Sequence, residues 1–187
     1  TGGIAQGDRL DVTISVEADA VAHVSTQSAT KVQSMDCNYA AAETTLSVGA
    51  DGHLDYVPEP TILNADARYH ESVQLDLAEG ATAVVSDVVV PGRLARGERF
   101  DFERYLSSIR ASGPDGTLFA DATHLTPAEA DPTAPGVLGE FAVYGTAFVV
   151  APDHDTDALS DRLHDAVADG PADAGATELP FGAGVVV

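Results

Sequence analysis

The sequence is poor in cysteine and contains no tryptophan. Cys37 is the only cysteine, so an internal disulfide cannot form and a zinc site held by several thiolates is excluded. A single thiol fits a reducing compartment, and we expect the protein to be cytoplasmic.

Basic residues and long apolar runs are also scarce. Only 9 residues are Lys or Arg, Lys31 is the sole lysine, and only the stretch from Arg93 to Arg110 concentrates positive charge. Phosphate binding requires clustered basic residues, so we expect no nucleic-acid partner. The longest apolar run, residues 84–90, is interrupted by Ser86 and Asp87 and is far shorter than the ~18–20 residues of a membrane span. We expect no membrane partner either.

Acidic residues, by contrast, are abundant. The chain has 30 Asp and Glu residues and a formal net charge of −21. Such a charge repels itself in dilute buffer, whereas molar salt shortens the Debye length to about 3 Å and screens the repulsion. Because the acids are scattered singly along the chain, a metal store is disfavoured. We predict adaptation to a high-salt cytoplasm.

Alternating apolar and polar residues predict a mainly β protein. In the first such segment Leu10, Val12, Ile14 and Val16 share one face. The continuously apolar segment 82–90 is typical of a central strand that is covered on both faces. Strands are expected at 10–16, 21–26, 30–35, 44–48, 53–57, 68–77, 82–90, 98–109, 117–124, 143–150 and 183–187. Asp51-Gly52 and residues 113–116 are predicted to form hairpin turns.

One amphipathic helix is predicted at residues 155–168. Either Asp153 or Asp155 would cap its start, and Gly170 would end it. Many strands with one late helix indicate stacked or sandwiched sheets. The length of 187 residues suits a single domain over residues 1–187. We expect its ends to be trimmed, because the chain opens without methionine and stops in an apolar run.

No catalytic or resident metal site is recognisable. The Gly-x-Ser-x-Gly nucleophile elbow does not occur, and none of the six histidines pair at the i, i+4 spacing of a helical metal site. Cys37 is expected to be a small buried residue, since Met35 and Asp36 beside it would complete only a poor ligand set. We therefore predict no enzyme activity and no tightly bound cofactor.

Two polar segments are more elaborate than plain scaffolding requires. In residues 57–62, Pro58 and Pro60 bracket Glu59 and fix the direction of the backbone. Residues 91–100 gather three basic residues around the carboxylate of Glu98. This second segment could be an ion-pair network that holds a loop on a sheet, or a polar surface for a partner or a passing cation.

These segments resemble a known family. In family order they are Gly2-Gly3 with Gly7-Asp8, Thr26 to Val32 with the single lysine Lys31, Pro58 to Ile62, Gly92 to Phe100, and Gly145-Thr146. Together they are similar to the urease accessory proteins UreD, also called UreH, over nearly the whole chain to residue 150. The block Gly-Arg-x-Ala-Arg-Gly-Glu is the most specific part.

The resemblance implies a fold, partners and a role. The family fold is a layered, β-helix-like stack of sheets with one or two short helices. The implied role is that of a non-enzymatic maturation factor that binds apo-urease with UreF and with UreG, a nickel-carrying GTPase, and assists nickel insertion. A homodimer is compatible with such a scaffold.

The resemblance also singles out residues for a transient nickel path. Nickel accepts oxygen and nitrogen ligands, and a conduit must bind it weakly enough to release it. By the family motif, the carboxylates expected on this path are Glu59, Asp87 and Glu98. The residues expected to form the partner or structural motif are Lys31, Pro58, Pro60, Thr61, Arg93 and Arg96.

Two other classes of protein were weighed against this one. A carbohydrate-binding β-sandwich would display exposed aromatics. Here tryptophan is absent, and Phe and Tyr are sparse, with 6 and 5 residues. A metal hydrolase on a β scaffold, such as a cupin-like barrel, would show closely spaced histidines on one strand. The remaining alternative is a β-sheet binding module for another ligand.

Overall fold

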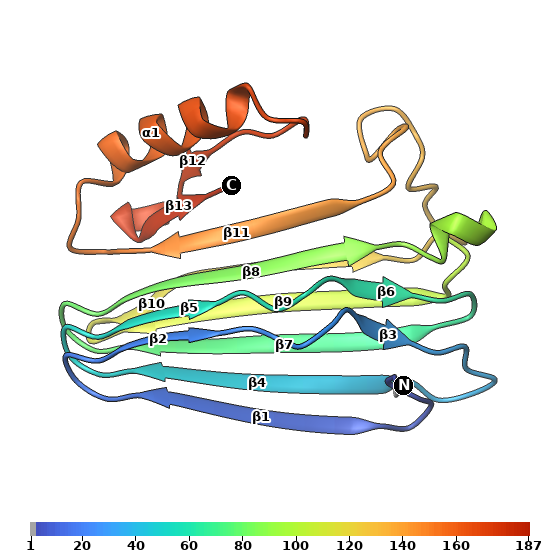
Figure 1. The fold of residues 1–187 in the computed structure, drawn as a ribbon, viewed down its shortest axis with the longest axis horizontal. Helices are drawn as coiled ribbons and strands as arrows, with labels where there is room; N and C mark the ends of the chain where they lie inside the picture. The colour runs from blue at the N-terminus through green and yellow to red at the C-terminus, as the bar shows by residue number, and fades with distance from the viewer. Residues whose placement is uncertain (1–2) are drawn as a thin grey trace.

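The computed structural model describes residues 3–187, and its strands follow the period-two patterns of the sequence. They form two sheets that face each other (Figure 1). In spatial order the five-stranded sheet contains β1 (Arg9–Val16), β4 (Ala40–Val48), β7 (Arg68–Leu77), β9 (Arg104–Gly113) and β10 (Gly116–Leu125). The eight-stranded sheet contains β12 (Thr177–Glu178), β13 (Gly184–Val186), β11 (Tyr144–Val150), β8 (Thr82–Val90), β5 (His53–Tyr56) and β2 (Val21–Val24), with β3 (Thr30–Val32) and β6 (Thr61–Leu63) alongside.

The chain winds between the two sheets as a solenoid. It passes from β1 to β2 and β3, returns to β4, crosses to β5 and β6, and repeats the circuit through β7 and β8. The successive coils pair in parallel, as β1 with β4, β4 with β7 and β5 with β8. The predicted layered, β-helix-like stack of sheets is confirmed.

A corner of this solenoid corrects one prediction. Asp51-Gly52 was expected to form a hairpin, but it turns the chain from β4 in one sheet to β5 in the other. Asp51 has a positive φ of 55°, so the local turn chemistry was inferred correctly and its topological use was not. The second predicted hairpin is confirmed, because residues 113–116 join the antiparallel strands β9 and β10.

Antiparallel strands and one helix complete the molecule. β11 pairs antiparallel with β8, and β13 pairs antiparallel with β11. The helix α1 (Thr156–Ala168) lies over β12 and β13 (Figure 1). Asp155 caps it by accepting a hydrogen bond from the backbone N–H of Ala158 at 3.1 Å, as predicted. No helix of the described residues is both long and apolar enough to span a membrane.

Two further expectations are corrected. Residues 98–103 are not a strand, because the chain first forms the short 3-10 helix η1 (Leu94–Arg96) and turns at Phe100, whose φ is 60°. Cys37 is exposed and not buried, since it lies in the loop before β4, where its backbone N–H donates to the side chain of Gln6. The short strands β6 and β12 and the 3-10 helix η2 (Pro180–Gly182) were not foreseen.

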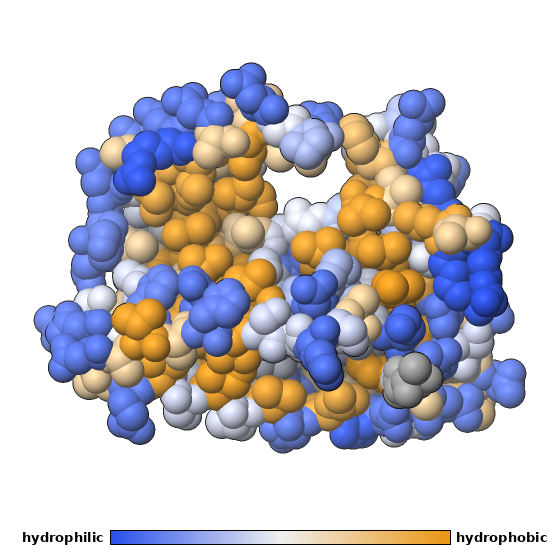
Figure 2. Space-filling model, viewed as in Figure 1, coloured by the Kyte–Doolittle hydropathy of each residue, from blue (hydrophilic) through white to orange (hydrophobic). Residues whose placement is uncertain are grey.

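The space between the sheets holds two apolar clusters. One contains Leu46, Leu54, Leu75 and Val150, and the other contains Leu63, Val89, Phe102 and the stacked pair Tyr69 and Tyr105. Apolar residues also reach the surface on the face shown in Figure 2, below α1 and toward η1, with hydrophilic residues along the rim.

Candidate functional site

A row of mostly small or polar side chains lies between the two apolar clusters. The strand register of the five-stranded sheet aligns Leu10, Ala42, Glu71, Ser107 and Thr123 across its whole width. Side chains two residues apart share a face, so Glu71 points inward with Val73 and Leu75. The short side chains in this row leave space that the apolar clusters do not fill.

This space is a cavity of about 630 Å³. Its lining extends from Arg9 and Leu10 on the edge strand β1 to Asp121 and Thr123 on the opposite edge strand β10. The facing sheet contributes Tyr56, Asp87, Tyr144 and Thr146, among others. The cavity therefore crosses the interior between two edges of the same sheet.

Two carboxylates from different sheets meet in this cavity through one phenol. The hydroxyl of Tyr105 on β9 lies 2.9 Å from Oδ2 of Asp87 on β8 and is also hydrogen bonded to Glu71 on β7. Ser107 donates to the same oxygen of Asp87 at 3.1 Å. These four side chains thus form one hydrogen-bonded cluster that links the two sheets.

The electrostatics of this cluster favour a bound proton. Burial, and after it the nearby charge of Asp87, raise the pKa of Glu71 to about 8, against smaller lowering effects of hydrogen bonds from Tyr105 and Tyr69. Burial also raises the pKa of Asp87. Both carboxyls keep some accessible surface because they face the cavity. Two carboxylates this close disfavour being ionised together.

The structure brings several of the predicted residues to this cavity. Lys31, Pro58, Glu59, Thr61 and Asp87 all line it. The segments that carry them meet because β3 pairs with β6, and because the backbone N–H of Glu59 donates to the hydroxyl of Thr26 at 2.9 Å. Gly2 of the first motif block lies outside the described residues.

The remaining predicted residues lie elsewhere. Among residues 3–187, Pro60, Arg93, Arg96 and Glu98 do not line the cavity. Arg93 forms a two-pronged ion pair with Glu98, and its Nε donates at 2.6 Å. This pair lowers the pKa of Glu98 and belongs to the turn around η1.

Arg99 ties that turn to a distant segment. Its guanidinium donates to the carbonyl oxygens of Gly139 at 3.0 Å and of Phe141 at 2.8 Å. The block of residues 91–100 therefore holds the connection between β10 and β11 in place. Contacts of this kind are what the loop-holding alternative predicts, and the alternative of a partner surface stays a prediction.

Glu71 and Tyr105 are the central residues that the sequence analysis missed. The strand predicted at residues 68–77 alternates Val73, Leu75 and Leu77, and extending this alternation by one step places Glu71 on the inner face. An ionisable residue at an inward position of a strand is an unusual feature that points to a site. Tyr105 gave no signal of its own, because its strand was predicted only as the range 98–109 and in fact runs over Arg104–Gly113.

The donor set suits a weakly held cation. It consists of carboxylate and hydroxyl oxygens, which are ligands for hard or borderline divalent ions. Within the described part of the chain, no group of three or more His, Cys, Asp or Glu residues has the geometry of a metal site.

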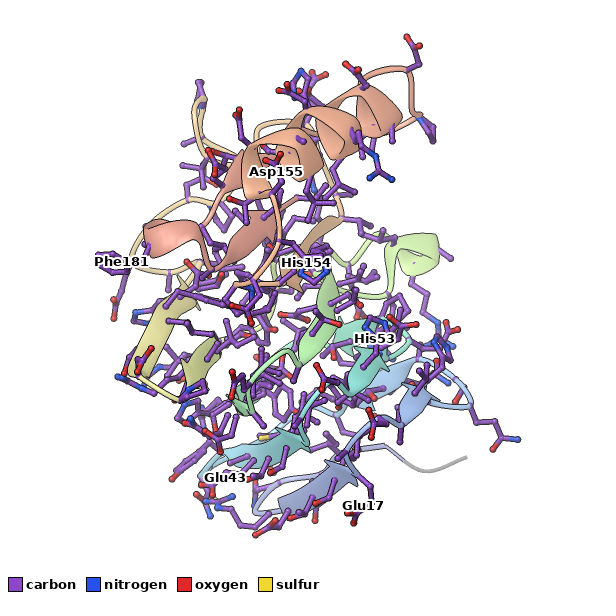
Figure 3. The ribbon with its side chains drawn as sticks, turned by 90° about the vertical axis from the view of Figure 1, so that its left-hand side faces the viewer. Glu17, Glu43, His53, His154, Asp155 and Phe181 are labelled. Atoms are coloured by element: carbon purple, nitrogen blue, oxygen red, sulfur yellow. The ribbon has the colours of Figure 1, made fainter. Side chains whose placement is uncertain are left out.

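On the outer face of the eight-stranded sheet, His53 and His23 contact Asp55 at 3.0 and 3.5 Å. Figure 3 places His53 on this side of the molecule and Glu43 on the other.

A sequence profile described as "UreD urease accessory protein" matches residues 1–187. The chain belongs to this family. Its sequence is 76% identical over 187 residues to the urease accessory protein UreD of Haloarcula marismortui, and 47% identical over 193 residues to that of Natronomonas pharaonis. All of this chain is covered in both comparisons, together with 62% and 63% of the two relatives. The chain thus spans less than two thirds of the length of these UreD proteins.

Proposed function

We propose that this chain is part of a urease maturation factor. The factor binds apo-urease together with UreF and UreG and assists nickel insertion into the urease active site. It acts without catalysis, holds no resident cofactor and works in the cytoplasm. Membership of the UreD family supports the role in urease maturation.

The observation that carries the nickel part of the proposal is the cavity with Asp87 and Glu71 at its centre. Its lining reaches both edge strands of the five-stranded sheet and includes a carboxylate toward each edge, Glu59 on one side and Asp121 on the other. An ion could move between oxygen ligands of this kind, because each binds it weakly enough to release it. Nickel is the cargo of this path.

The exposed apolar residues support the docking part of the proposal. Leu94 beside the Arg93–Glu98 pair and Val137, Phe141 and Val143 in the β10–β11 connection are all partly exposed. η1 and this connection lie at the same end of the molecule (Figure 1). Exposed apolar surface edged by charged groups is typical of a protein–protein contact. In this proposal Arg93, Arg96 and Glu98 act at a partner surface outside the cavity.

The proposal is tested in a halophilic host that lacks the gene for this protein and keeps urease and its other accessory genes. The measurement is nickel per purified urease, together with urease activity. We expect full-length urease with little nickel, and recovery of nickel when the wild-type gene is restored. Normal nickel and activity in the deletion strain would refute a maturation role.

A further inference from the structure

One end of the solenoid is uncovered. β1 and β2 belong to the first coil, and each is the last strand of its sheet on that side. Within residues 3–187, no strand pairs with the outer edge of either one. At the other end of the eight-stranded sheet, by contrast, α1 lies over β12 and β13 (Figure 1). Solenoid proteins normally cap their terminal coils, so the first coil offers a surface for contact.

The inner face of β1 is apolar but incompletely buried. Leu10 and Val12 point toward the interior, yet they remain 39% and 38% exposed. Farther along the same face, Ile14 packs against the first apolar cluster and Val16 belongs to it. A further strand beside β1 would remove Leu10 and Val12 from water, and this burial favours pairing.

The backbone of β1 presents a row of hydrogen-bonding groups to solvent. The carbonyl oxygens of Asp8 and Val16 accept hydrogen bonds from the backbone N–H groups of Ala41 and Gly49, at 3.0 and 2.8 Å. In a parallel pair each residue directs both of its backbone groups to one neighbour, and successive residues alternate. The residues whose backbone groups point away from β4 are therefore Arg9, Asp11, Thr13 and Ser15.

The two edge strands of this sheet differ in their protection against pairing. β10 has a bulge between Thr117 and Phe119, and Asp121 places a carboxylate on its inner face. Bulges and inward-pointing charges keep an edge strand from pairing. β1 has neither, since its register with β4 is continuous from Arg9 to Val16 and its inner face is apolar. It also contains no proline. β1 is thus an edge that can accept another strand.

We propose that β1 pairs antiparallel with β1 of a second copy of this chain, about a two-fold axis at Thr13, so that the two five-stranded sheets become continuous. The inference does not depend on the proposed function. The pairing leaves η1 and the β10–β11 connection free for another partner, because they lie on the other side of the molecule from β1 (Figure 1).

The backbone and the charges together select this axis. Residues that face the free edge can pair only with one another, so the axis must pass through a residue and not between two. An axis at Asp11 would place two carboxylates opposite each other, which is unfavourable. An axis at Thr13 places Arg9 of each copy opposite Glu17 of the other, and two threonines, a favourable pair, at the centre.

Both members of this charge pair are available. Arg9 and Glu17 are exposed, and neither takes part in an ion pair within the described residues. The guanidinium of Arg9 is held at the start of β1 by a hydrogen bond to the carbonyl oxygen of Tyr39, at 2.7 Å. Glu17 directly follows the other end of the strand (Figure 3). The two-fold axis forms this pair twice.

The apolar side chains match in the same register. Leu10 lies opposite Val16 of the second copy, and Val12 lies opposite Ile14. An axis at Val12 would instead place the carboxylate of Asp8 opposite Val16. The axis at Thr13 therefore joins apolar residue to apolar residue on the inner face.

The test is sedimentation equilibrium of this chain in molar KCl, over a range of protein concentrations. Salt is required because each copy carries a formal net charge of −21, and molar KCl screens the repulsion between them. We expect a monomer–dimer equilibrium that shifts to the monomer in dilute buffer. Hydrogen exchange should locate the contact, with residues 9–17 protected in concentrated samples and unprotected on dilution.

Charge exchange tests the register. Arg9→Glu and Glu17→Arg should each weaken the dimer roughly tenfold, because each places like charges opposite one another twice. The double variant, Arg9→Glu with Glu17→Arg, should recover the wild-type dissociation constant. Glu43→Arg makes the same change in net charge as Glu17→Arg, at an exposed position of the neighbouring strand, and should leave the dimer intact.

Three results would overturn the proposal. The first is a monomer in molar KCl up to millimolar protein. The second is a dimer in which residues 9–17 stay unprotected or the double variant is not rescued, since another surface then holds the copies together. The third concerns the longer UreD of Haloarcula marismortui, which is 76% identical over this chain. If that protein is monomeric with the corresponding strand protected, a segment of its own chain occupies the edge in place of a second copy.

Discussion

Asp87 on β8 accepts a hydrogen bond from the hydroxyl of Tyr105 on β9, at 2.9 Å, across the gap between the two sheets. The contact joins an acidic residue to a fully buried aromatic residue in the interior of a solenoid. Buried charge is costly unless it is paired, and no basic partner contributes here. The consequences of this arrangement can be measured in stability as well as in nickel binding.

The free energy of unfolding should depend on the protonation of Glu71. Its pKa is raised to about 8 in the folded protein, from an ordinary value of 4.5. Between these values the native state binds more protons than the unfolded state, so this group makes stability fall as pH rises from about 5 to 8. Glu71→Gln should therefore gain stability relative to wild type by a few kcal/mol between pH 5 and pH 8. Denaturant unfolding at fixed KCl measures this difference, and parallel curves for the two proteins would contradict it.

Arg99 should control the order of the β10–β11 connection. Arg99→Ala removes two hydrogen bonds to the carbonyls of Gly139 and Phe141 and should cost on the order of 1–3 kcal/mol. Hydrogen exchange followed by mass spectrometry should show faster exchange in residues 126–143. Arg96→Ala, at an exposed position on η1, is the matched control and should leave exchange in this segment unchanged. Equal exchange in both variants would show that Arg99 does not hold the segment.

The two glycines of the most specific motif block should differ in their tolerance of a side chain. A Cβ on Gly92 would lie 2.4 Å from the carbonyl oxygen of Glu98, and φ there is +148°. At Gly97, φ is +79° but nothing lies within 4 Å. Gly97→Ala should thus cost only about 1 kcal/mol of backbone strain, whereas Gly92→Ala must also displace the backbone and should cost clearly more. Thermal unfolding of both variants tests this order, and equal losses would contradict it.

The sequence predicted most of the strands and part of the site. The alternation in residues 68–77 and the apolar run 82–90 gave β7 and β8 with their observed bounds, because each strand buries a full side-chain face. Turn chemistry at Asp51-Gly52 could not reveal that the chain changes sheets there, since a positive φ serves a hairpin and a solenoid corner alike. Asp87 and Glu59 were identified through the resemblance, whereas the pairing of Asp87 with Glu71 depends on contacts between sheets that the sequence alone does not specify.

Salt should stabilise the protein strongly. The formal net charge is −21. The described residues form only four ion pairs, two of which involve histidine, so most of the acidic side chains have no basic partner. Raising KCl from about 0.2 M to 2 M shortens the Debye length to a few ångströms and screens the repulsion between acidic side chains. The midpoint of thermal unfolding should rise over this range. A midpoint that stays constant or falls would contradict the predicted adaptation to high salt.

The central claim is that the carboxylates inside the cavity carry nickel to urease. It is tested most directly by nickel per urease active site in the deletion strain complemented with Asp87→Asn, compared with Glu43→Gln. Both variants remove one negative charge, but only the first changes the cavity. We predict that urease matured with Asp87→Asn contains much less nickel, while urease matured with Glu43→Gln is fully loaded. Full loading with a folded Asp87→Asn variant present at wild-type levels would contradict the claim.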